Sequence, residues 1–223
     1  AEKMVRGEAE VNDCPVCGLD AKKLIAEVLG KAVTESSPKV AVIRCQKETI
    51  EPRYDYDGIK DCRAAATLNG GFTTCQYGCL GLGNCAAACK FEALYMGTDG
   101  MPHVVEEKCV ACGACVKACP RGIIVIAPLA SDVNVLCNSR HNGKYTKDCC
   151  SHGCIGCKIC EKKCPTAAIK VENFLASIDY DKCIVCGACV GACPTGAIGD
   201  LSLLRGKGKT AAQRYEPAPA AAE

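Results

Sequence analysis

The chain contains the segment Cys183-Ile184-Val185-Cys186-Gly187-Ala188-Cys189-Val190-Gly191-Ala192-Cys193-Pro194, in which two, two and three residues separate successive cysteines. A loop this short can wrap three thiolates around one small inorganic cluster. The fourth cysteine lies on a following helical turn and, in two-cluster modules, ligates the other cluster. Pro194 then prevents the chain from continuing that helical turn. The spacing therefore predicts 4Fe-4S sites.

The same spacing occurs twice more in the chain, and a proline follows the fourth cysteine each time. Glycines at positions 113, 156 and 187 allow the backbone to approach the inorganic sulfides closely. Zinc ribbons, the main alternative, pair two separated Cys-x-x-Cys units and do not repeat a triple run with a trailing Cys-Pro. The spacing therefore favours iron–sulfur clusters over zinc. The two further runs are Cys109, Cys112, Cys115, Cys119-Pro120 and Cys154, Cys157, Cys160, Cys164-Pro165.

The cysteines also show that residues 38–130 and 131–203 are two copies of one unit. Each copy opens with strand-like residues, 40–43 or 133–136, and carries a short predicted hairpin between its cysteine groups, over 93–105 or 169–178. Four cysteines recur at a shift of 75 residues and four at a shift of 74. The pairs are Cys75 and Cys150, Cys79 and Cys154, Cys85 and Cys160, Cys89 and Cys164, then Cys109 and Cys183, Cys112 and Cys186, Cys115 and Cys189, Cys119 and Cys193.

The composition points to a fold held together by metal. Cysteine provides 23 of the 223 residues, whereas Trp is absent and only three Phe and seven Tyr are present. A chain so poor in large apolar side chains needs metal or disulfides to complete a small core. The cysteine count is odd and residues 1–10 are charged, so we expect thiol ligands in a reducing compartment instead of secreted disulfides. No window reaches the roughly 18 apolar residues of a membrane span.

The charge distribution predicts an acidic protein with one basic stretch. A formal net charge of +2 indicates neither nucleic acid nor an acidic membrane as a target. Four thiolates on an oxidised 4Fe-4S core leave about −2 per site, so four sites bring the total to about −6. Between residues 139 and 163, six basic side chains stand against two acidic ones, Asp148 and Glu161. The basic residues are Arg140, Lys144, Lys147, Lys158, Lys162 and Lys163.

Both copies resemble 2(4Fe-4S) bacterial ferredoxin domains, which implies an α+β fold of two tandem ferredoxin-like modules after a small helical N-terminal segment. We expect module 1 over residues 38–130, module 2 over 131–203 and a disordered tail over 204–223. The resemblance implies that the fourth cysteines cross between sites. Three ligand sets follow: Cys154, Cys157, Cys160 and Cys193; Cys183, Cys186, Cys189 and Cys164; and Cys109, Cys112, Cys115 and Cys89.

The fourth site departs from the pattern. Leu82 occupies the place of the second ligand, and Lys90 replaces the proline. Cys75, four residues before Cys79, is the substitute that we assign, and Cys62 is the alternative. A lost cluster with buried thiols is the other interpretation. The assigned set is Cys75, Cys79, Cys85 and Cys119, which brings the total to about four clusters.

Seven cysteines lie outside the regular pattern. Cys45 and Cys137 each end the strand that opens a copy, and Cys62 and Cys149 both follow Lys-Asp. These four thiols could form a further site or be buried and inert, and we favour the inert interpretation. The other three are Cys14, Cys17 and Cys150, the last of which is the repeat partner of Cys75.

The N-terminal segment resembles the B subunits of Rnf complexes, which are membrane-bound, ion-translocating and ferredoxin-oxidising. The resemblance covers residues 8–15, a predicted helix capped by Asp20 and ended by Gly30, residues 38–43 and residues 75–85. In that family a membrane anchor precedes a four-cysteine cluster domain, and Cys14 matches the last ligand of that domain. Residues 1–37 would then be the remnant of this domain with one helix. The other ligands, a further cluster and the anchor are expected before Ala1.

The resemblance implies that the chain relays electrons from reduced ferredoxin to other Rnf subunits at the cytoplasmic face of the cell membrane. It would be held there through the complex or through the anchor. The complex reduces NAD or another acceptor, whereas this chain is expected to make and break no bond itself. Ferredoxins are usually acidic, so the basic stretch is a predicted docking site. A soluble polyferredoxin and the electron-input subunit of a hydrogenase or heterodisulfide reductase are the alternatives.

The remaining residues carry no motif for another chemistry. No Gly-x-Gly-x-x-Gly follows a predicted strand, so no nucleotide site is expected. The histidines at 103, 141 and 152 have no acid–base constellation around them and are expected at the surface.

Overall fold

The computed structural model describes residues 2–14, 17–32, 37–46 and 51–202. The predicted tail over 204–223 lies outside the described residues. The described part contains short helices and two-stranded antiparallel sheets, which agrees with the α+β fold expected from the two ferredoxin-like copies. None of its helices is long and apolar enough to cross a membrane.

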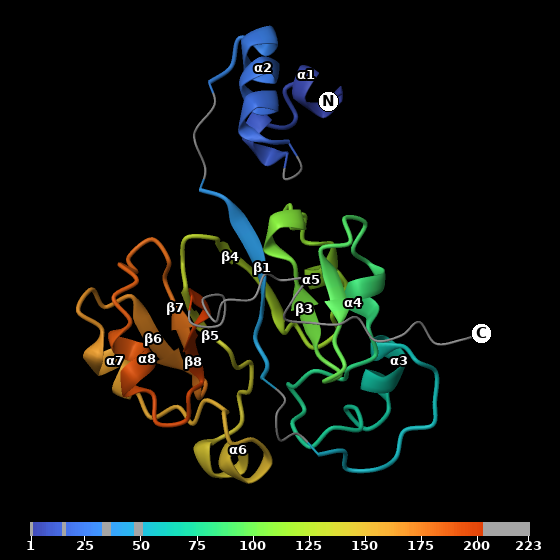
Figure 1. Ribbon diagram of the computed structural model, residues 1–223, viewed down its shortest axis with the longest axis vertical. Coiled ribbons are helices and arrows are strands. Elements are labelled where there is room, and N and C mark those ends of the chain that lie inside the picture. Colours follow the sequence, from blue (N-terminus) through green and yellow to red (C-terminus); the bar gives the residue numbers. More distant parts are fainter. Residues whose placement is uncertain (1, 15–16, 33–36, 47–50, 203–223) are drawn as a thin grey trace.

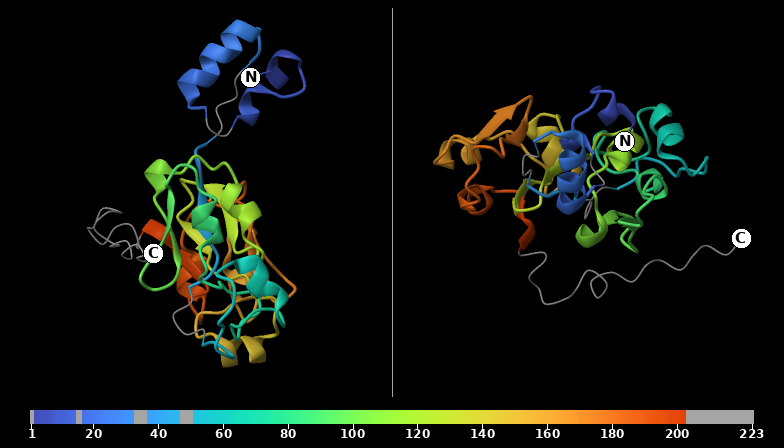
Figure 2. Two further views of the ribbon diagram at one scale, coloured as in Figure 1. Left: turned by 90° about the vertical axis from the view of Figure 1, so that its right-hand side faces the viewer. Right: turned by 90° about the horizontal axis from the view of Figure 1, so that it is seen from above.

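The N-terminal segment forms two helices and a 3-10 turn that lie apart from the rest of the molecule (Figures 1 and 2). They are α1 (Glu2–Val5), η1 (Val11–Asp13) and α2 (Leu19–Leu29). Gly30 ends α2 in the left-handed conformation, as expected, but Gly18 and not Asp20 is its N-cap residue. The helix thus begins earlier than predicted, and Asp20 lies in its first turn, where a carboxylate favours the positive end of the helix dipole.

Module 1 is built around a sheet that joins its first and last strands. Strand β1 (Lys39–Ile43) pairs with β4 (Ile124–Pro128) in the register Val40 to Ala127 and Val42 to Val125. Between them lie a hairpin, β2 (Leu94–Met96) with β3 (Pro102–Val104), and four short helices. The helices are α3 (Cys62–Thr67), α4 (Asn84–Ala87), η2 (Glu106–Lys108) and α5 (Ala114–Ala118).

Module 2 repeats this plan. Strand β5 (Val133–Val135) pairs with β8 (Ile198–Asp200), and the hairpin is β6 (Ile169–Glu172) with β7 (Leu175–Ile178). Its tip holds two successive residues, Asn173 and Phe174, at positive φ of 49° and 62°. Two residues at positive φ fit the right-handed twist of a hairpin. The helices are α6 (Gly143–Cys149), α7 (Ile159–Lys163) and α8 (Ala188–Ala192).

Each module has its own core, in which cysteines contribute alongside aliphatic side chains. In module 2, buried Val133, Ile169 and Ile198 pack around cysteines, and Ile123 and Ile124 do so in module 1. All four strand pairs lie within the ranges expected for the two copies. We therefore propose 38–130 and 131–203 as the two units.

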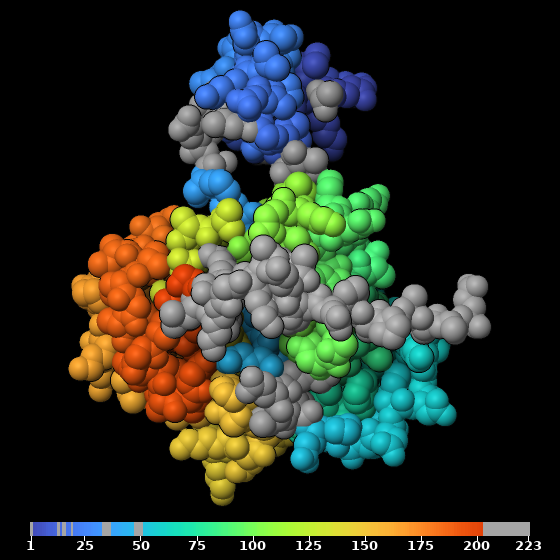
Figure 3. Space-filling view, viewed as in Figure 1, coloured from blue at the N-terminus to red at the C-terminus, as the bar shows by residue number. Residues whose placement is uncertain are grey.

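The modules pack side by side, and the joint between them is partly apolar (Figure 3). Leu136 of module 2 packs with Val40, Val42 and Ala127 of the β1–β4 sheet. The Asn138 side-chain amide also donates a hydrogen bond of 2.9 Å to the carbonyl oxygen of Arg121. The ends of β1 and β5 consequently lie close to one another, and each is followed by a cysteine.

Candidate metal centres

Four loops in the two modules share one backbone shape. In each, the residues on either side of the second ligand position have positive φ. Glycine adopts this conformation readily, but a β-branched residue such as Val185 (φ 54°) pays a steric cost there. Loops that keep this shape despite the cost point to a common ligand. The pairs of residues are Gly81 and Gly83, Ala111 and Gly113, Gly156 and Lys158, and Val185 and Gly187.

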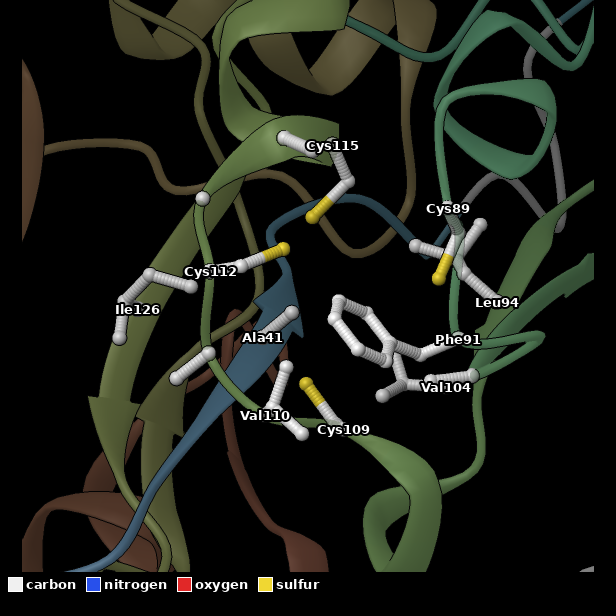
Figure 4. Close-up of a pocket in the computed structure, with 14 residues that line it drawn as sticks. Ala41, Cys89, Phe91, Leu94, Val104, Cys109, Val110, Cys112, Cys115 and Ile126 are labelled. Carbon is white, nitrogen blue, oxygen red and sulfur yellow. The ribbon is translucent and has the colours of Figure 1, made fainter. Parts of the chain in front are cut away.

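The first regular run and its crossed ligand surround one cavity of about 350 Å³. Cys109, Cys112 and Cys115 line it from the loop before α5 and from α5 itself, and Cys89 lines it from the end of α4. Figure 4 shows the four sulfur atoms around the same space, with the Phe91 ring among them. The predicted quartet is therefore brought together.

The two runs of module 2 surround two further cavities, of about 310 and 300 Å³. In each, the three cysteines of one run are joined by the fourth cysteine of the other run. The crossing that the ferredoxin resemblance implies is therefore present in the folded chain. The first cavity is lined by Cys154, Cys157, Cys160 and Cys193, and the second by Cys183, Cys186, Cys189 and Cys164.

The irregular loop surrounds a cavity of about 330 Å³ with a different fourth cysteine. Cys79, Cys85 and Cys119 line this cavity as expected, but the remaining cysteine is Cys62. The structure does not place Cys75 among them. The alternative weighed from the sequence thus matches the geometry better than the assigned residue.

Cys62 is held at this cavity by paired hydrogen bonds between α3 and α4. The Asn84 side chain accepts from the backbone amide of Cys62 at 2.7 Å and donates to the Asp61 carboxylate at 2.7 Å. Asp61 in turn caps α3 by accepting from the amides of Arg63 and Ala64. Hydrogen bonds from Ala64 and then Asn84 lower the pKa of the Asp61 carboxyl. Asp61-Cys62 as a helix start, with Asn84 opposite, is the sequence signal that identifies this ligand.

The thiols of the four cavities differ in acidity according to their surroundings. Burial, and then the neighbouring Cys119, raises the pKa of Cys85 to about 11, and burial with Cys154 does the same for Cys160. Burial acts on Cys164 and Cys193 as well, but hydrogen bonds to their sulfur atoms outweigh it and lower both pKa values. One such bond runs from the Ala168 amide to Cys164 Sγ at 3.2 Å. The crossing cysteines of module 2 are therefore arranged to be thiolates.

The cavities fit a multi-iron cluster better than a single ion. Within the described ranges, no three His, Cys, Asp or Glu side chains are close enough together to hold one metal ion. In a 4Fe-4S cluster each cysteine binds a different iron, so the four sulfur atoms lie further apart than the ligands of one ion. The cysteines are present as thiols and not as disulfides.

Cys75 and four other cysteines outside the regular pattern lie together elsewhere. They line a fifth cavity, of about 350 Å³, between the modules. The other four cysteines are Cys45, Cys137, Cys149 and Cys150. The sequence indicated that Cys45 and Cys137 occupy equivalent positions but did not indicate that they meet.

The remaining candidate residues lie away from these cavities or do not match their expected surroundings. Cys14 and Cys17 are neighbours in the N-terminal segment, with their sulfur atoms 2.8 Å apart. The three histidines are partly buried, which differs from the expected surface positions. His141 packs between Tyr77 and Tyr145, and burial lowers its pKa.

The basic stretch is exposed and lies beside the cavity of Cys154, Cys157 and Cys160. Its six basic side chains are all at the surface, as is Cys157 itself. Lys158, Lys162 and Lys163 flank this ligand on α7 and at its N-cap. Positive charge therefore surrounds the most accessible sulfur atom of that site.

Comparison with known proteins supports the cluster chemistry of these cavities. A family profile described as a 4Fe-4S dicluster domain matches residues 153–198, and one described as a 4Fe-4S binding domain matches residues 102–125. Together the matched ranges contain the three regular runs.

Three relatives extend the similarity over most of the chain, and each is the B subunit of an oxidoreductase complex. Over 184 residues, 82% of this chain, it is 46% identical to that of the Na⁺-translocating ferredoxin:NAD⁺ oxidoreductase complex of Acetobacterium woodii and 48% identical to that of the ion-translocating oxidoreductase complex of Methanosarcina acetivorans. Over 157 residues, 70% of this chain, it is 43% identical to that of the proton-translocating ferredoxin:NAD⁺ oxidoreductase complex of Clostridium ljungdahlii. The aligned regions span 55%, 70% and 55% of these relatives, so the chain covers only about half the length of two of them.

Proposed function

Since the chain belongs to the family of B subunits of ion-translocating Rnf oxidoreductase complexes, we propose that it relays electrons one at a time from reduced ferredoxin through 4Fe-4S clusters into such a complex. Its partners would be ferredoxin and the other subunits, and its place the cytoplasmic face of the membrane that holds them. The chain itself makes and breaks no bond in this role. The observation that carries the proposal is that four separate cavities each collect four cysteines from crossed segments.

The ligand sets that we propose follow the cavities. Three are the crossed sets that the ferredoxin resemblance implies, and in the fourth Cys62 replaces Cys75. When bound, the clusters supply one-electron carriers whose potentials depend on hydrogen bonds and burial. The protein contributes backbone amides that donate to sulfur, as from Gly81 to Cys79 Sγ at 3.3 Å, and apolar walls that exclude water. The fourth set is Cys62, Cys79, Cys85 and Cys119.

Electron input is proposed at module 2, through the site of Cys154, Cys157, Cys160 and Cys193. Cys157 is exposed, and three lysines surround it, at positions 158, 162 and 163. The holo-protein is expected to be acidic overall, so this basic patch is a local exception. An acidic ferredoxin would be drawn to the patch by long-range charge attraction, which raises the encounter rate and orients the two redox centres.

The test compares two triple charge reversals in the cluster-loaded protein. Lys158, Lys162 and Lys163 are changed to Glu in one variant, and in the matched control the exposed Lys90, Lys108 and Lys117 of module 1 are changed to Glu. Both variants alter the net charge by the same amount. Reduction by ferredoxin is followed by stopped-flow absorbance at low and high salt.

We expect the module 2 variant to be reduced at least about ten times more slowly than wild type at low salt, with the deficit shrinking as salt screens the charges. The control should lose much less, and reduction of both by a small uncharged donor should be unchanged. Equal rates for the two variants at low salt would place the docking site elsewhere. A cluster-loaded wild-type protein that ferredoxin does not reduce would contradict the proposed function as a whole.

A further inference from the structure

The fifth cavity lies at the junction of the two modules, where the chain leaving β1 and the chain leaving β5 meet next to α6 (Figure 1). Module 1 contributes Cys45 and Cys75, and module 2 contributes Cys137 with the adjacent pair Cys149-Cys150. Its volume of about 350 Å³ falls at the upper end of the 300–350 Å³ range of the four cavities described above. Five cysteines from four chain segments therefore converge on a space of the same size.

The positions of these cysteines follow the internal repeat. Cys45 and Cys137 each stand shortly after the strand that opens a module, and Cys75 and Cys150 are repeat partners. Two copies facing one another across a joint bring equivalent residues to the same place. The cavity is therefore a product of the way the modules pack.

Two of these thiols receive the same hydrogen bonds as the ligands proposed for the other sites. Cys137 Sγ accepts from the Cys154 amide at 3.2 Å and from the Ser139 amide at 3.4 Å. Cys45 Sγ accepts from the Cys79 amide at 3.4 Å. Backbone amides directed at sulfur stabilise thiolates and are typical of cluster ligands. An inert buried thiol requires no such donors.

A buried cation lines the same cavity. The Nε atom of Arg44 is buried and has no hydrogen-bond partner among the described residues. Burial lowers the pKa of this guanidinium, while Tyr180 and Cys137 act to raise it. A buried positive charge without a partner is costly unless a negative group lies nearby. Four thiolates on an oxidised 4Fe-4S core carry a net charge of about −2 and would supply one.

We propose that this cavity holds a fifth 4Fe-4S cluster, ligated by Cys45, Cys75 and Cys137 and by one cysteine of the Cys149-Cys150 pair. This proposal rests on the cluster chemistry of the proposed function but adds a site that the ferredoxin pattern does not contain. It also accounts for Cys75, which the geometry removes from the irregular site.

The position gives the fifth site a role in joining the modules. Cys79, whose amide binds Cys45 Sγ, lines the irregular cavity of module 1, and Cys154, whose amide binds Cys137 Sγ, lines the cavity proposed for electron input in module 2. The site is therefore one hydrogen bond away from a proposed ligand on either side. An electron leaving one of these clusters reduces the fifth and then the other, with no bond made or broken.

The test is the iron and acid-labile sulfide content of the reconstituted full chain. Five sites predict about 20 iron atoms and 20 sulfides per chain, and four sites predict about 16. Cys75→Ser, Cys137→Ser and the double variant C149S/C150S should each lower the count from about 20 to about 16. The control Cys17→Ser lies outside both modules and should leave it unchanged. Circular dichroism checks that each variant is folded.

A second readout separates a lost cluster from a damaged protein. On full reduction, spin integration by electron paramagnetic resonance should fall from about five to about four spins per chain in each of the three variants. About 16 iron atoms in wild type, unchanged in the variants, would overturn the fifth site and leave the proposed function standing, as would a disulfide between Cys75 and Cys149. About eight or fewer iron atoms, or bound zinc, would instead contradict the cluster assignments of the proposed function.

Discussion

The loop over residues 79–89 and its repeat partner over residues 154–164 fold alike but use different ligands. In module 2 the second ligand position holds Cys157, on the loop itself. In module 1 the same position holds Leu82, and Cys62 reaches the cavity from α3, about 20 residues earlier in the chain. Both loops nevertheless keep positive φ on either side of that position. The backbone shape of a cluster loop is thus independent of where one of its four thiols comes from.

This difference makes module 1 more dependent on its tertiary structure. Module 2 takes its ligands from two compact runs, whereas the irregular site requires α3, the loop and Cys119 to be in place together. We expect the two modules to respond differently to treatments that weaken tertiary contacts.

Removal of the clusters should have the largest effect. Because ligand binding contributes much of the folding free energy of small metal domains, chelation or oxidative loss should unfold both modules over residues 71–200. On reconstitution, module 2 should regain protection from hydrogen exchange before module 1, because its ligands are local. Hydrogen exchange with mass spectrometry measures both steps. An apo-protein that keeps its secondary structure and melts cooperatively would refute the expectation.

Exchange of the distant ligand for a local one should have the next largest effect. Cys62→Ser should lower the iron content by about four atoms per chain, one 4Fe-4S cluster. The double variant C62S/L82C places a cysteine at the position that Cys157 occupies in module 2, and the iron content should return. If Cys62→Ser leaves the iron content unchanged, the proposed ligand set is wrong. The single variant Leu82→Cys serves as the control.

The contact between α3 and α4 should matter less than the thiol itself. Asn84→Ala removes two hydrogen bonds that hold Cys62 at the cavity and should cost about 1–3 kcal/mol in the free energy of unfolding. The cluster should still form but be lost to a chelator several times faster, which visible absorbance can follow. Ser177→Ala, in the exposed hairpin of module 2, should cost under about 0.5 kcal/mol.

The same contact predicts a pH dependence. The folded-state pKa of Asp61 is lowered, so its stabilising effect is present above the ordinary carboxyl pKa and is lost as the pH falls through the lowered value. Asn84→Ala removes one of the hydrogen bonds that lower this pKa. The variant should therefore lose this part of its stability at a higher pH than wild type does. Two-dimensional NMR of the Asp61 carboxyl during titration measures the shift directly.

The smallest effect should come from single residues of the two loops. Gly83 and Lys158 occupy equivalent positions, with φ of 80° and 61°. Gly83→Ala should destabilise the loaded protein by about 1 kcal/mol, because a Cβ is unfavourable in the left-handed region. Lys158→Gly should change stability by less than about 0.5 kcal/mol, since relief of that strain is offset by a more flexible unfolded chain. Thermal melting under anaerobic conditions compares the two.

Much of the fold follows from the sequence because the cysteine spacing is local. The three regular runs predict their own loops, and the turn residues between the cysteine groups predict both hairpins. The last strands, β4 and β8, were harder to assign because they are short and their partners open the modules more than 60 residues earlier. Spacing within a run contains no information about such distant pairs.

The candidate site shows the same limit. Every thiol whose place is fixed by local spacing lies in the expected cavity. Cys62 and Cys75 were exchanged because their places depend on the contact between Asp61 and Asn84, and on the packing of one module against the other. The preference for inert thiols at Cys45 and Cys137 had the same cause, since neither shows its neighbours in the sequence.

The pairing of the first strand of each module with its last has a consequence for the origin of the chain. A unit that starts and ends at adjacent points can be duplicated in tandem, with only the four residues 129–132 needed to connect the copies. The second copy then adds its clusters without rearranging those of the first. The joint created by the duplication is new protein surface on both copies, and residues such as Cys45 and Cys137 that face it were free to acquire a purpose that a single copy could not serve.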